Sequence, residues 1–75
     1  MAQRIPALRS QRNEALNQAE LLEINGKYIE AAQQFDLASK LSVEIGEMDK
    51  AKEYLSQSQR LMSLAELAKL RERLK

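Results

Sequence analysis

The sequence predicts an all-α protein, an up-down-up bundle of three helices that forms a single domain over residues 1–75. Leu (12) and Ala (10) dominate the apolar residues, whereas Gly (2), Pro (1), Tyr (2) and Phe (1) are scarce, and this composition favours helices. Chain reversals are expected at only two places, Asn25-Gly26 and Gly46, because glycine adopts the left-handed conformation that ends a helix. Short connections make neighbouring helices antiparallel, which gives the up-down-up order.

The first two helices are expected over about residues 6–24 and 27–45. Pro6 stands in the first turn of the first helix, where proline is tolerated. Apolar residues then follow the 3-4 spacing of one helix face, on which Arg12 is the one polar residue. The inward face of the second helix is expected to comprise Tyr28, Ala31, Phe35, Ala38, Leu41 or Ser42, and Ile45.

The third helix is expected over about residues 48–74, with Asp49 placing negative charge at the positive helix end. It carries two apolar stripes, the second rotated relative to the first. The first comprises Met48, Ala51, Leu55, Ser58, Leu61, Met62 and Ala65, and the second comprises Leu64, Leu67, Leu70 and Leu74. At about 1.5 Å per residue this helix would be roughly 40 Å long, so its end is expected to extend past the other two.

Composition argues against catalysis. The chain has no cysteine and no histidine, which removes disulfides, zinc sites built on these residues, and Ser-His or Cys-His nucleophile pairs. Carboxylates at helical reach are Glu20 with Glu23, Glu44 with Glu47, and Glu66 alone. None has an evident apolar pocket around it, so we interpret them as solvated surface charge and expect no enzyme activity, no cofactor and no metal site. The lack of a long apolar run predicts a soluble, cytoplasmic protein without a transmembrane segment.

Charge is distributed unevenly along the chain. The net charge of +1 divides into +3 over residues 1–12, −5 over residues 13–59 and +3 over residues 60–75. The basic ends contain Arg4, Arg9 and Arg12, and Lys69, Arg71, Arg73 and Lys75. The acidic middle and the lack of interleaved aromatics argue against sequence-specific nucleic-acid binding. Weak attraction to an anionic surface is one interpretation of the ends, and compensation of the helix dipole is the other.

One pattern is typical of a tight helical hairpin. Gly26, Tyr28, Ala31, Phe35 and Ala38 place a glycine at the turn, small side chains where helices approach, and a phenylalanine in the space between them. Read alone, these residues predict only packing. They also resemble the tetratricopeptide-like hairpin, whose pattern is Gly-x-Tyr-x-x-Ala-x-x-x-Phe-x-x-Ala.

The similarity to a second family covers roughly residues 15–65. Leu16, Ala19 and Glu23 precede the run over residues 26–32 at the spacing of the microtubule interacting and transport (MIT) domain, a three-helix relative of that hairpin. Residues 52–61 resemble that family's third-helix run Tyr-Leu-x-Arg-Ala-Glu-x-Leu. Residues 57–59 are Gln-Ser-Gln where the family has Arg-Ala-Glu, so the carboxylate that pairs with a basic residue of the bound motif is missing.

The MIT resemblance implies a non-enzymatic adaptor in protein transport that binds an amphipathic helix, typically the C-terminal tail of an ESCRT-type subunit, between the second and third helices. A second mode in the family uses the groove between the first and third helices. Carried over to this chain, the first groove would be lined by Phe35, Ala38, Ser39, Ser42, Leu55, Ser58, Gln59 and Met62. Two alternatives stay open: these residues form the core, and the chain self-associates as a homo-oligomer through the leucines at the end of the third helix.

Overall fold

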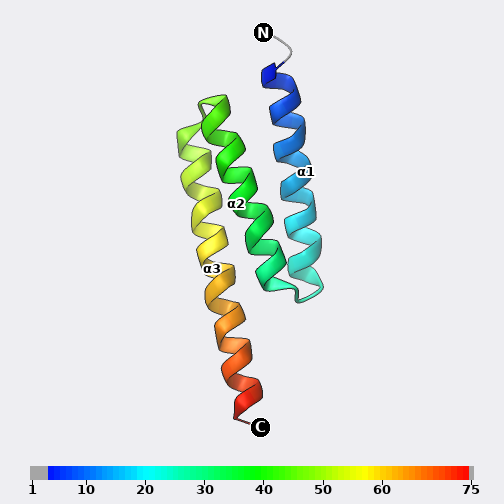
Figure 1. Ribbon diagram of the computed structural model, residues 1–75, viewed down its shortest axis with the longest axis vertical. Helices are drawn as coiled ribbons and strands as arrows, with labels where there is room; N and C mark the ends of the chain where they lie inside the picture. The colour runs from blue at the N-terminus through cyan, green and yellow to red at the C-terminus, as the bar shows by residue number, and fades with distance from the viewer. Residues whose placement is uncertain (1–3, 75) are drawn as a thin grey trace.

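The computed structural model describes residues 4–74 and shows an all-α bundle of three helices. These are α1 (Arg4–Ile24), α2 (Tyr28–Ile45) and α3 (Met48–Arg73), and each runs antiparallel to the helix before it (Figure 1). The first helix therefore begins two residues before the expected residue 6, and the second begins one residue after the expected residue 27. Among the described residues, no helix is long and apolar enough to span a bilayer.

Both turns are closed by glycine. Gly26 has a φ of +77° and Gly46 a φ of +95°, the left-handed conformation that only glycine adopts without strain. After α2, the N–H of Gly46 donates to the carbonyl of Val43 at 3.0 Å and the N–H of Glu47 donates to that of Ser42 at 2.9 Å. This is the Schellman pattern, and it pairs carbonyls that the helix end would leave without a donor.

The helix α2 lies between α1 and α3 and packs against both (Figure 1). Among the described residues, no Cα of α1 lies within 8 Å of a Cα of α3. Small side chains on α2 let both neighbours approach closely. The buried core cluster comprises Ala19, Ala31, Ala32, Phe35 and Leu61, with Leu16, Leu22, Tyr28, Tyr54 and Leu64 packed around it.

The first stripe predicted for α3 is only partly buried. Met48, Leu55 and Met62 were expected on the inward face, but their side chains are exposed. The reason is that the backbone of α3 lies close to that of α2 alone, so only a narrow line of the α3 surface is covered. That line comprises Ala51, Ser58, Leu61 and Ala65, and the three exposed side chains lie roughly a quarter turn away from it.

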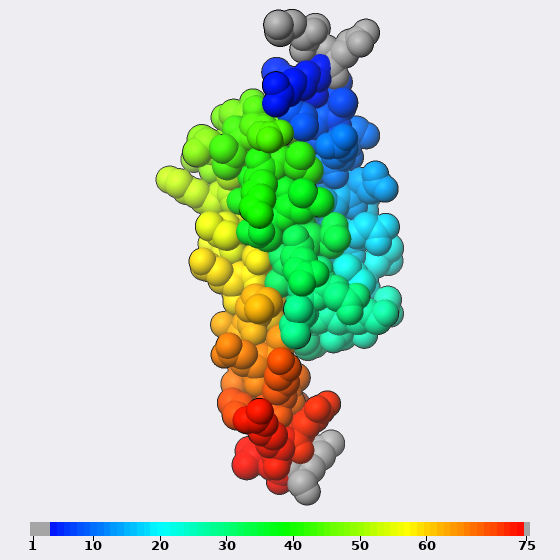
Figure 2. All heavy atoms as spheres, viewed as in Figure 1, coloured from blue at the N-terminus to red at the C-terminus, as the bar shows by residue number. Residues whose placement is uncertain are grey.

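The end of α3 stands clear of the bundle. Ala65 is the last buried residue, and residues 66–74, here called the α3 extension, are all exposed. Figures 1 and 2 show this segment, in orange to red, projecting past the turn between α1 and α2. Its leucines are largely open to water, with exposed fractions of 59% for Leu67, 51% for Leu70 and 89% for Leu74. Lys75 lies outside the described residues.

Candidate functional site

The eight residues predicted to line a groove between α2 and α3 divide into two groups. Five of them are buried: Phe35, Ala38, Ser39, Ser42 and Ser58. The other three are exposed on α3: Leu55, Gln59 and Met62. The α2–α3 contact is thus closed along most of the predicted groove, and binding of a partner there stays a prediction.

Buried serines join α2 to α3 through hydrogen bonds. The Ser39 hydroxyl donates to the carbonyl of Ala51 at 2.7 Å, and the Ser58 hydroxyl donates to that of Ala32 at 2.9 Å. Ser42 instead donates to the Ala38 carbonyl of its own helix at 2.9 Å. Buried hydroxyls need such partners, because an unpaired one costs free energy. These three hydroxyls therefore have a structural role inside the bundle.

Removing one cross-helix hydroxyl tests this contact. We expect Ser58→Ala to lower the free energy of unfolding by about 1 kcal/mol, measured by urea denaturation, because a hydrogen bond is lost while its carbonyl acceptor keeps its helical partner. Ser63→Ala, on an exposed face of the same helix, is the matched control and is expected to change stability by less than about 0.5 kcal/mol. Equal effects of the two substitutions would mean that the cross-helix bond contributes nothing.

A second surface, between α1 and α3, is open. It consists of two neighbouring hollows that share Glu20 and Glu23. The first hollow is lined by Leu16, Glu20, Glu23, Phe35, Glu53, Tyr54 and Gln57. The second, nearer the α3 extension, is lined by Glu20, Glu23, Ile24, Tyr28 and Leu64. Together they form what we call the α1–α3 groove, which exists because the backbones of α1 and α3 both lie against α2 but not against each other.

The α1–α3 groove combines an apolar floor with an acidic rim. Arg60 of α3 crosses it, with its Nη2 3.2 Å from Oε2 of Glu23 and its Nε donating to Gln57 Oε1 at 2.9 Å. Both ion-pair partners are partly exposed, so the pair is expected to contribute little stability. Among residues 4–74, Glu20 and Glu53 form no ion pair within 4.0 Å. Two carboxylates on this rim are therefore free to meet a cation.

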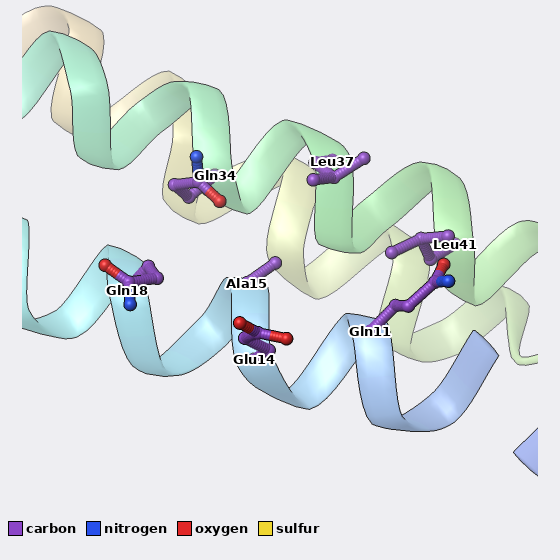
Figure 3. A pocket seen from close by; sticks show the side chains of 7 residues that line it. All are labelled: Gln11, Glu14, Ala15, Gln18, Gln34, Leu37 and Leu41. Atoms are coloured by element: carbon purple, nitrogen blue, oxygen red, sulfur yellow. The ribbon is translucent and has the colours of Figure 1, made fainter. Parts of the chain in front are cut away.

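A third hollow lies between α1 and α2 (Figure 3). Side chains of both helices line it: Gln11, Glu14, Ala15, Gln18, Gln34, Leu37 and Leu41. Its polar groups are mostly uncharged amides, which both donate and accept hydrogen bonds and so select no particular ligand charge. This hollow is less distinctive than the α1–α3 groove.

Two charged residues singled out in the sequence, Arg12 and Glu47, stabilise the fold rather than lie free on the surface. Arg12, counted in the basic N-terminal end, is buried, and its guanidinium donates to the Glu47 carboxylate at the start of α3. Arg12 is therefore withdrawn from any anion-binding surface. Glu47, which was interpreted from the sequence as solvated surface charge, is partly buried in this ion pair. Within residues 4–74, no group of three or more potential metal-ligating side chains is present.

Comparison with protein-family models, with curated proteins and with solved structures gives no match to this chain. The resemblance to the MIT family therefore rests on the sequence patterns that suggested it and stays a prediction. The geometry of the groove has to carry any functional conclusion.

Sequence reasoning did not identify most of this groove. Glu20 and Glu23 were considered only as a carboxylate pair, and Glu53 and Tyr54 were not assigned to a binding surface. The available signal was the −5 charge of residues 13–59 beside apolar positions on two separate helices. Which of those positions share a groove depends on the placement of α1 and α3 on either side of α2. The sequence pattern alone does not determine that placement.

Proposed function

We propose that the chain is a non-catalytic interaction module that binds a basic amphipathic helix in the α1–α3 groove. The observation that carries the proposal is an apolar floor, formed by Leu16, Phe35 and Tyr54, beside the unpaired carboxylates of Glu20 and Glu53. An amphipathic helix inserts apolar side chains at i, i+3, i+4 and i+7 into such a floor. Its cations then lie against the acidic rim, which favours basic partners over acidic ones.

The α1–α3 groove is preferred to the α2–α3 groove because five of the eight residues predicted for the latter are buried. One of these five, Phe35, lines the α1–α3 groove instead. The second binding mode of the MIT family uses the corresponding groove, and this resemblance supports the choice. From the same resemblance we propose that the bound helix is the tail of an ESCRT-type subunit. The chain would then act as an adaptor in protein transport. The cytoplasmic location stays a prediction.

Peptide titration tests the proposal. The probe is a fluorescent synthetic helix with leucines at i, i+3 and i+7 and lysines on its flanks. We expect saturable binding that Glu20→Lys combined with Glu53→Lys weakens by about tenfold or more, because the rim then repels the peptide. The matched control is Glu30→Lys combined with Glu44→Lys, which makes the same change of charge at exposed positions on α2.

The control pair is expected to leave the affinity within about twofold, since its charges lie outside the groove and are screened by salt. Equal weakening by both pairs would show that the peptide responds to net charge alone and would contradict the proposal. The helical circular dichroism of both variants is measured first, because an unfolded variant would also fail to bind the peptide.

Self-association is the second candidate function. It is favoured by the three exposed leucines of the α3 extension, which leave a long apolar surface uncovered at the end of the molecule. In this interpretation the domain serves to bring two copies of a larger assembly together.

A further inference from the structure

The C-terminal part of α3, from Arg60 to Leu74 and including the α3 extension, has the pattern of a ligand for the α1–α3 groove. Positions 60, 64, 67, 71 and 74 are spaced by four, three, four and three residues, so they lie along one helix face. Arg60, Leu64, Leu67, Arg71 and Leu74 occupy them. A seven-residue repeat of this kind is typical of helices that pack side by side with a nearly parallel or antiparallel partner.

Charge complements the groove. The α3 extension carries Lys69, Arg71 and Arg73 against Glu66 and Glu72. The rim of the α1–α3 groove carries Glu20, Glu23 and Glu53, with Arg60 as the cation described between them. Opposite charges on the two surfaces favour their association and set its orientation.

The extension cannot reach the groove of its own chain. Because α3 is continuous to Arg73, its end points away from the bundle rather than back along α1 (Figure 1). A second copy is not limited in this way. Two copies can place their α3 helices side by side in opposite directions, so that each extension lies over the bundle of the other.

We propose that two copies of this chain form an antiparallel dimer in which the α3 extension of each lies in the α1–α3 groove of the other, an inference that rests on the groove of the proposed function. With the two-fold axis near Leu64, Arg71 comes opposite Gln57 and Leu74 comes opposite Tyr54. Gln57 and Tyr54 both line the groove. The same surface of each copy is used twice, so the interface is closed and stops at two chains.

A dimer interface has to cover only a small part of the exposed surface. Each chain exposes 5666 Å². A stable interface of standard size buries about 800 Å² per partner, roughly one seventh of that area. Contact along α3 on both sides of the axis would cover Leu67 and Leu74, which otherwise lie in water. The extension and the groove are thus complementary in apolar pattern, charge and direction.

Engineered cysteines test the register, because the chain has none of its own. Residues 57 and 71 are about 21 Å apart along one helix, whereas a disulfide needs Cα atoms within about 7 Å, so Gln57→Cys combined with Arg71→Cys can link only two different chains. We expect mild oxidation to convert most of this double variant to a covalent dimer. Gln57→Cys alone, which would link parallel helices only, and Leu55→Cys combined with Arg71→Cys are expected to stay uncrosslinked.

Light scattering of the full chain over a hundredfold range of concentration completes the test. We expect a dimer that Leu67→Glu combined with Leu74→Glu converts to a monomer with unchanged helical content. A dimer that crosslinks through Gln57→Cys alone, or that fails to crosslink through the antiparallel pair, overturns the inference. A monomer at every concentration also overturns it, and the peptide titration then shows separately whether the groove binds a helix from another protein.

Discussion

Leu61→Ala is expected to lower the free energy of unfolding by about 2–5 kcal/mol, the cost of removing a large apolar side chain and leaving a cavity. Leu61 is fully buried in the core cluster that also contains Ala19 and Phe35. Natural domains are stable by about 0.05–0.15 kcal/mol per residue, so a chain of 75 residues has little to spare. We expect urea denaturation followed by circular dichroism to show a largely unfolded variant or a much lower midpoint.

Leu55→Ala is the matched control for this experiment. It makes the same chemical change on the same helix at a side chain that is 43% exposed. We expect a loss below about 1 kcal/mol, because only part of its apolar surface is removed from water on folding. If the two substitutions were equally costly, Leu61 would not be the core residue described above.

The helices of this fold follow from strong local signals in the sequence. Gly26 and Gly46 mark both reversals, and their positive φ values show the conformation for which glycine was expected there. The inward face of α2 could be predicted from the sequence because α2 is covered on two sides and its apolar stripe is wide. On α3 the same reasoning placed Leu55 and Met62 too far inward, because a helix with one neighbour buries a narrower line than its apolar residues cover.

The candidate site was much harder to predict from the sequence than the helices were. Its residues come from three helices, and Leu16, Phe35 and Tyr54 share a groove only because α2 separates α1 from α3. Hydrogen bonds between helices could not be predicted from the sequence either, because the acceptor of Ser58 is a backbone carbonyl 26 residues away. Local periodicity carries no information about partners at that separation.

The partly buried ion pair between Arg12 and Glu47 is the second substitution site with a large expected effect. The Arg12 side chain is 10% exposed and the Glu47 side chain 29% exposed. Removing the carboxylate leaves a guanidinium without its partner in a largely dry position, which is costly. We expect Glu47→Ala to lower the free energy of unfolding by about 2–3 kcal/mol, between the values typical of surface and fully buried pairs. Urea denaturation at neutral pH measures it.

Because Arg12 is more deeply buried than Glu47, a substitution of Arg12 serves as the control for this prediction. Arg12→Met keeps an apolar stem in the buried position and leaves only Glu47, which water can reach, so we expect it to cost less than Glu47→Ala. Lys40→Ala, which breaks the exposed pair of Lys40 with Asp36, is expected to cost less than about 0.5 kcal/mol. If Glu47→Ala were as mild as Lys40→Ala, the connection between α1 and the start of α3 would be an ordinary surface contact. The two outer helices would then be held together mainly by their packing against α2.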